Sequence, residues 1–284
     1  MSYRQKYVQC ISPTGLHRMA YTEWGDPANT RVVVCVHGLT RSGRDFDELA
    51  AALSGEFRVV CPDVAGRGLS DRLADASAYG VPQYVADMMV LIGRLDVEQV
   101  DWVGTSMGGL IGMTLASLPQ APIRRLVLND VGPLLTADAL RRIGDYVGLD
   151  PRWDSFEEAL AYMKVICRPF GTLSEGQWER MTAHSVAARP DGSWGFRYDP
   201  RIAEPFRQGF TGQDIDLWPV YERIKCPTLV MRGALSDLLT AETWQAMGER
   251  GPKAARVQID GVGHAPMFTD AGQIAPVRAF LGGA

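Results

Sequence analysis

The chain has 284 residues, a length that suits one large domain or one domain with an insertion. Its 29 basic and 33 acidic side chains give a net charge of −4, so neither nucleic acid nor an anionic membrane surface is an expected partner. Hydrophobic residues make up 46% of the sequence, which excludes long disorder, and no apolar run approaches the roughly 20 residues of a membrane-spanning helix.

The N-terminal residues have no apolar segment behind their basic side chains, so no secretory signal is predicted and a cytoplasmic location is expected. The five cysteines are scattered and show no C-x-x-C spacing, which predicts reduced thiols in the core. We expect a monomer or a small homo-oligomer.

Strand-like and helical patterns alternate over the first half of the chain. Two weak strands, 7–11 and 19–24, predict an antiparallel hairpin at the edge of a sheet. Continuous apolar runs then predict strands that are buried on both faces, with helices between them. The predicted elements after the hairpin are strand 31–37, helix 46–53, strand 57–61, helix 85–95, strand 100–103, helix 110–118 and strand 126–128. This alternation predicts a doubly wound, mostly parallel sheet with right-handed crossovers.

The alternation stops near residue 132, and a helical, loop-rich and aromatic pattern follows. Strand patterns return at 228–231 and 256–259, with helices predicted at 242–247 and 273–281. A segment of about 90 residues between two strands of one sheet is too long for a loop. We therefore predict a core of residues 1–132 and 225–284, interrupted by a helical cap of residues 133–224.

The segment Gly104-Thr-Ser-Met-Gly108 fits the G-x-S-x-G pattern and lies where a predicted strand ends and a predicted helix begins. A nucleophile on so sharp a turn needs neighbours without a Cβ, so that its hydroxyl stands exposed above the sheet. Ser106 is therefore the predicted nucleophile, and it needs a positioned base.

Four histidines are available as that base. His17 lies in the predicted hairpin, His184 in the predicted cap, and His37 ends a core strand. His264 lies in a glycine-rich loop between the last strand and the last helix, from which its imidazole can return across the sheet edge. We expect His264 to be the base.

The third member of such a triad is a carboxylate that holds the imidazole in one tautomer. Asp237 follows the strand at 228–231 and completes the chain order Ser, Asp, His, so it is our preferred acid. Asp130 follows the preceding strand and is the alternative, and Asp260 is a weaker third candidate.

Backbone donors for the oxyanion are expected at two turns. The glycine of His37-Gly38-Leu39 lets the N–H of Leu39 face the nucleophile, and Met107 provides a second N–H at the start of a helix. The segment 63–71 resembles a phosphate loop but lacks its lysine, so we expect a structural turn there. Because no metal-ligand spacing is present, neither a metal nor a cofactor is expected.

These motifs together resemble the α/β-hydrolase fold, of the capped type with a serine nucleophile, over nearly the whole chain. The resemblance implies a mostly parallel eight-stranded sheet flanked by helices, with a helical cap insertion. It also implies Ser106 as nucleophile, Asp237 as acid, His264 as base and the turn at Leu39 as part of the oxyanion hole. Epoxide hydrolases and haloalkane dehalogenases of this fold place Asp where Ser106 stands, which disfavours their chemistry.

The function we predict is hydrolysis of a small carboxylic ester or lactone through an acyl-enzyme. Two alternatives remain open: hydrolysis of a C–C bond next to a ketone by the same residues, and a non-catalytic ligand receptor on the same fold. The oxyanion stretch 37–42 departs from the glycine-rich run of the C–C bond hydrolases, which disfavours C–C bond hydrolysis. Substrate identity depends on the cap, where the resemblance is too loose to transfer.

Overall fold

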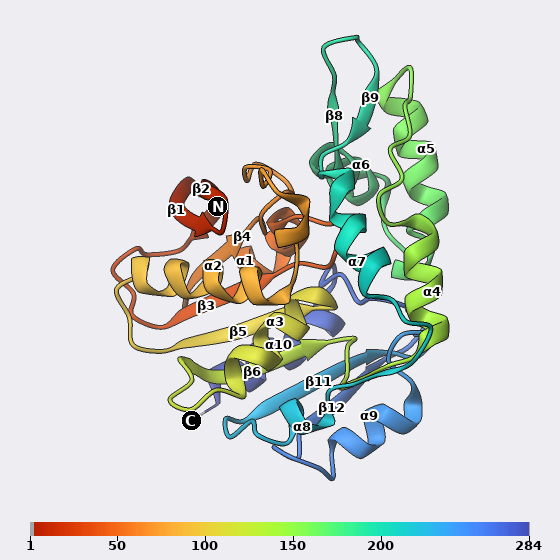
Figure 1. Ribbon diagram of the computed structural model, residues 1–284. Coiled ribbons are helices and arrows are strands. Elements are labelled where there is room, and N and C mark those ends of the chain that lie inside the picture. Colours follow the sequence, from red (N-terminus) through yellow and green to blue (C-terminus); the bar gives the residue numbers. More distant parts are fainter. Residues whose placement is uncertain (1–2, 284) are drawn as a thin grey trace.

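The computed structural model describes residues 3–283 and is built around one large sheet (Figure 1). Its eight strands lie in the order β1-β2-β4-β3-β5-β6-β11-β12. The pairs β1–β2 and β2–β4 are antiparallel, and the other neighbours run parallel. The strands are β1 (Arg4–Ser12), β2 (Gly15–Trp24), β3 (Val32–Val36), β4 (Arg58–Pro62), β5 (Val100–Thr105), β6 (Ile123–Asn129), β11 (Thr228–Gly233) and β12 (Ala255–Ile259). The predicted mostly parallel sheet and its edge hairpin are confirmed.

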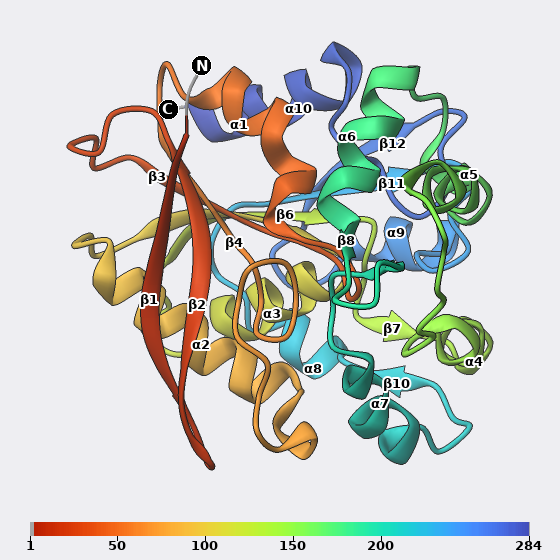
Figure 2. The ribbon, with the colours of Figure 1, turned by 90° about the horizontal axis from the view of Figure 1, so that it is seen from above.

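Helices cover both faces of this sheet (Figure 2). Helices α1 and α10 pack on one face, whereas α2, α3, α8 and α9 pack on the other. Their bounds are α1 (Asp47–Leu53), α2 (Val81–Arg94), α3 (Met107–Ala116), α8 (Trp218–Tyr221), α9 (Ala241–Met247) and α10 (Ala271–Gly282). Short 3₁₀ turns lie at η1 (Gly43–Phe46) and η2 (Ala76–Ala78).

Strand β3 shows why the central strands read as continuous apolar runs. Val33 and Cys35 belong to the apolar cluster on the α1 and α10 side, while Val32, Val34 and Val36 belong to the cluster on the α2 and α3 side. All five side chains are buried. A strand covered on both faces needs apolar residues at every position, because neither face meets water.

An insertion, residues 130–227, lies between β6 and β11. It contains α4 (Ala137–Tyr146), α5 (Phe156–Ile166), α6 (Glu175–Ser185) and α7 (Ala203–Gly209), with 3₁₀ turns η3 (Arg168–Phe170) and η4 (Pro200–Ile202). Two small antiparallel pairs were not predicted: β7 (Leu134–Leu135) with β10 (Ile215–Asp216), and β8 (Val186–Ala188) with β9 (Trp194–Phe196). Strands of two or three residues are too short to carry an alternating pattern.

Some aromatic side chains of the insertion pack on one another, whereas Trp218 and Tyr221 belong to the main apolar core. Trp153 contacts Tyr162 and Phe196 with ring centroids 5.2 and 5.1 Å apart, and Phe196 stacks on Tyr198. These rings therefore form an aromatic cluster within the insertion, which Tyr198 joins to the main apolar core. Within residues 3–283, no helix is long and apolar enough to cross a membrane.

Candidate active site

Ser106 occupies the turn between β5 and α3. Its φ of 52° and ψ of −116° are strained for a residue with a side chain. The two flanking glycines are required by close approach: a Cβ on Gly104 would lie 2.3 Å from the carbonyl oxygen of Gly108, and one on Gly108 would lie 2.0 Å from that of Val36. The glycine pattern thus has the steric origin that the sequence predicts.

His264 lies in the loop between β12 and α10 and bridges two side chains from other loops. The hydroxyl of Ser106 donates to its Nε2, with the two atoms 3.0 Å apart. Its Nδ1–H donates to Oδ2 of Asp130 at 2.7 Å. A carboxylate can only accept this hydrogen bond, so the proton of the neutral imidazole is on Nδ1. Nε2 then has a lone pair that can take the proton of Ser106.

The carboxylate of Asp130 is fixed by the neighbouring strand as well as by His264. Its Oδ1 accepts the N–H of Gly233 at 2.9 Å, and its Oδ2 accepts the hydroxyl of Ser236 at 2.6 Å. The backbone N–H of Asp130 also donates to the carbonyl of Met231 at 2.8 Å. The side chain is fully buried, and both of its oxygens accept hydrogen bonds.

The prediction that Asp237 contacts His264 is wrong. The carboxylate of Asp237 is 58% exposed and forms an ion pair with Arg142 of α4. Because β6 and β11 are neighbours in the sheet, both following loops reach the same edge, and the sequence pattern does not distinguish them. The alternative acid, Asp130, is the carboxylate brought to the imidazole, and the chain order Ser, Asp, His is kept.

The turn after β3 is held by a buried, neutral imidazole. Nε2 of His37 accepts the N–H of Val64 at 2.9 Å, so the proton is on Nδ1, which donates to the carbonyl of Gly38 at 2.7 Å. Burial lowers the pKa of His37 to about 4. Since a peptide unit is planar and trans, fixing the carbonyl of Gly38 makes the N–H of Leu39 point the opposite way.

Both expected oxyanion donors lie beside Ser106 in the fold. Leu39 follows Gly38, whose added Cβ would be 3.7 Å from the Cβ of Ser106, and Met107 is the first residue of α3. Neither N–H donates to a protein acceptor within residues 3–283. Two free N–H groups near one hydroxyl suit an anion that forms during a reaction.

The loop 63–70 is a structural turn, as its lack of the phosphate-binding lysine indicates. Oδ1 of Asp63 accepts the N–H of Gly43 at 2.8 Å, and Oδ2 accepts the N–H of Leu69 at 2.8 Å. Sequence reasoning assigned no role to Arg67 of this loop, although its Nε donates to the carbonyl of Leu39 at 2.8 Å. It also missed Ser236, the donor to Asp130; no motif identifies either residue.

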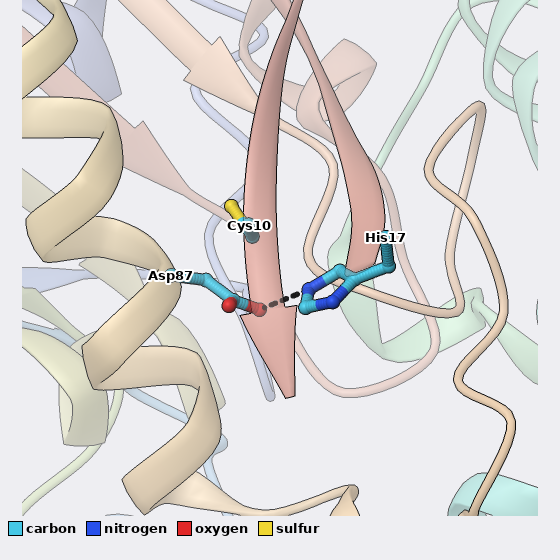
Figure 3. Close-up of side chains that lie close together, drawn as sticks. All are labelled: Cys10, His17 and Asp87. Atoms are coloured by element: carbon cyan, nitrogen blue, oxygen red, sulfur yellow. Dashed lines mark hydrogen bonds and ion pairs between the residues drawn. The ribbon is translucent and has the colours of Figure 1, made fainter. Parts of the chain in front are cut away.

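A separate group of possible metal ligands lies between the hairpin and α2. Figure 3 shows Cys10, His17 and Asp87 together, all buried, with Nε2 of His17 donating to Asp87 at 3.0 Å. Gln83 donates to the other carboxylate oxygen at 2.7 Å. Burial and the nearby Asp87 raise the pKa of Cys10 to about 12, so this thiol is protonated at neutral pH. We assign these side chains to packing the hairpin on α2.

The sequence matches the model of the alpha/beta hydrolase family over residues 33–277. It is 56% identical over 290 aligned positions to a 3-hydroxybutyrate-oligomer hydrolase of Cupriavidus necator, covering 100% of this chain and 99% of that protein. Among solved structures, a putative hydrolase from Rickettsia typhi has a TM-score of 0.91 and 31% identity, covering 100% of both chains. An alpha/beta hydrolase from Novosphingobium aromaticivorans has a TM-score of 0.88 and 35% identity, covering 99% of this chain and 98% of that one.

Proposed function

The chain belongs to the alpha/beta hydrolase family, and from that premise we propose that it hydrolyses carboxylic esters through an acyl-enzyme formed on Ser106. The observation that carries the proposal is the hydrogen-bonded series from Ser106 through His264 to Asp130, with contacts of 3.0 and 2.7 Å. Hydrolase relatives favour an enzyme over the ligand receptor that the sequence left open. The exposed Asp237 is not part of this series.

The residues of the site have distinct roles in the proposed reaction, and His264 acts first as base and then as acid. Nε2 of His264 takes the proton of Ser106 as its Oγ attacks the ester carbonyl carbon. The N–H groups of Leu39 and Met107 bind the resulting oxyanion. Collapse of this intermediate expels the alcohol, which receives the proton from His264, and Asp130 stabilises the imidazolium in between.

Deacylation repeats these steps with water in place of Ser106. Nε2 of His264 removes a proton from a water molecule, whose oxygen attacks the acyl carbon. The second tetrahedral intermediate uses the same two N–H donors, and its collapse returns the proton to Oγ of Ser106 and releases the acid. No proton acceptor beyond His264 is needed in either half.

For the substrate, we propose short linear oligomers of 3-hydroxybutyrate. Support comes from the relative of that activity, which is 56% identical to this chain and aligns with it over its full length. Such oligomers are carboxylic esters in which the leaving alcohol is itself a hydroxy acid, so the chemistry above applies unchanged. An ester-like small molecule is then the expected partner.

The proposed nucleophile is tested by Ser106→Ala. We expect kcat on the 3-hydroxybutyrate trimer to fall by about 10⁴–10⁶, because binding and the oxyanion donors alone do not replace covalent catalysis. Release of the monomer is followed by chromatography, beside p-nitrophenyl esters from acetate to decanoate.

The control is labelling by a fluorophosphonate, which should mark Ser106 in the parent protein and no residue in the variant. Trimer hydrolysis by Ser106→Ala within tenfold of the parent would contradict the proposed function. Efficient cleavage of simple esters without cleavage of the trimer would contradict the proposed substrate but not the proposed ester hydrolysis.

A further inference from the structure

A guanidinium group is buried behind the turn of the proposed oxyanion hole. Arg67 is 1% exposed. Its Nη1 donates to the carbonyl of Ala65 at 2.7 Å and to the hydroxyl of Tyr84 at 2.8 Å. Its Nε donates to the carbonyl of Leu39 at 2.8 Å, and its Nη2 lies 3.8 Å from the sulfur of Met107. Leu39 and Met107 are the two residues whose N–H groups are assigned to the oxyanion.

No carboxylate forms an ion pair with Arg67 in the part of the chain that the structure describes. Its neighbours are neutral: two carbonyls, one hydroxyl, one thioether and the rings of Tyr79 and Tyr84, with centroids 5.7 and 5.0 Å from its Cζ. Burying a charge without a counter-ion costs free energy, even when its donors are satisfied. A negative charge formed nearby during turnover would offset part of that cost.

We propose that Arg67 is a positioning residue of the oxyanion hole, which fixes Leu39 and Met107 and places a positive charge without an ion-pair partner behind them. This rests on the proposed ester hydrolysis. His37 holds the carbonyl before the N–H of Leu39, and Arg67 holds the carbonyl after it. With both carbonyls fixed, the direction of this N–H is set before substrate arrives.

The charge of Arg67 also acts on the turn through His37. Burial lowers the pKa of His37 to about 4, and the positive charge of Arg67 acts in the same direction. A neutral His37 keeps the Nε2 lone pair that accepts the N–H of Val64. Arg67 therefore supports the turn by a direct bond to Leu39, and its charge adds to the effect of burial on the pKa of His37.

The test uses Arg67→Gln, which removes the charge and the fork of donors, and Arg67→Lys, which keeps the charge but has only one nitrogen to share among these acceptors. We expect kcat to fall about 10- to 100-fold in the Gln variant and less in the Lys variant, with KM within about threefold. A trifluoromethyl ketone, which forms an oxyanion adduct with the serine, should lose affinity by the same factor as kcat/KM.

Tyr84→Phe is the matched control. It removes another hydrogen bond of Arg67, to a side chain that is not part of the hole, so it should lower the melting temperature while kcat and ketone affinity stay within twofold. The proposal is overturned if Arg67→Gln keeps kcat and ketone affinity within twofold of the parent; if that variant does not fold, Arg67→Lys is judged by the same limit. Failure of the proposed function is separate, because the parent would then hydrolyse no ester and take no fluorophosphonate label.

Discussion

His264 has two ring nitrogens, and its carboxylate partner decides which one carries the proton. Asp130 accepts from Nδ1 at 2.7 Å, whereas Asp237 is held at the surface by Arg142. We expect Asp130→Asn to lower kcat by about 10²–10⁴, because an amide in this place favours the wrong tautomer. Asp237→Asn should keep kcat within twofold, since a surface ion pair contributes little.

Both variants should be measured for kcat and for melting temperature on the same preparations. An active and stable Asp130→Asn beside an inactive Asp237→Asn would reverse the assignment. A variant that loses activity only in proportion to lost folded protein would show a structural role instead.

At this scale the sequence predicts residues that a local pattern defines. Ser106 is found from its glycines and His264 from its loop, and both glycine and loop effects are local. The acid depends on which of two adjacent strands reaches the imidazole, and that depends on side-chain packing. Ser236 completes the bonds to Asp130 only through that packing, so no sequence spacing indicates it.

An apolar cluster joins the insertion to the loop that carries His264. Met267, three residues after His264, packs with Met163, Trp178 and Met181 of α5 and α6. We expect Trp178→Ala to shift the preferred oligomer length toward longer substrates, because a large side chain beside this loop is removed. Rates on the dimer, trimer and tetramer of 3-hydroxybutyrate provide the measurement.

Trp153→Ala is the control, since Trp153 is similarly buried but packs in the outer aromatic cluster. It should lower the melting temperature and leave the order of the three rates unchanged. If both tryptophan variants keep the parent's preference, the length-selecting pocket lies outside this cluster.

Elements with long patterns are predicted well, and short ones are not. The continuous apolar runs at β3 and β5 are recognisable in the sequence, because strands covered on both faces need apolar residues throughout. Strands β8 and β9 have three residues each and form because Trp194 and its neighbours pack on α5 and Trp153. Helix α2 begins at Val81, earlier than predicted, where Pro82 suits the first turn of a helix.

The whole molecule is expected to lose stability in mild acid, through its buried histidine. Burial lowers the pKa of His37 to about 4 in the folded protein, whereas an exposed histidine has a pKa of about 6.5, so between these limits the unfolded chain binds more protons. The free energy of unfolding therefore rises with pH across that window and falls as pH drops. At pH 5 the loss from His37 alone is about 2 kcal/mol relative to neutral pH.

Urea unfolding at pH 7.5 and pH 5.0 measures this difference. His37→Gln removes the titrating ring while keeping an amide that can donate and accept, so its difference should be smaller by about 2 kcal/mol. Burial also lowers the pKa of His184, which adds loss in the same direction to both proteins. Equal differences in parent and variant would show that His37 does not control acid sensitivity.

Asp130 is the first residue of the insertion, so the proposed catalytic acid sits at the joint between a sheet and a segment of about a hundred residues. Its backbone N–H is tied to Met231 and its side chain to Gly233, both on the adjacent strand β11. These hydrogen bonds hold Asp130 on the sheet. A movement of the insertion would therefore change the backbone after residue 130 before it rotated the carboxylate. Mechanical decoupling of this kind lets the insertion diverge in sequence, or move to admit a substrate, while the proton relay keeps its alignment.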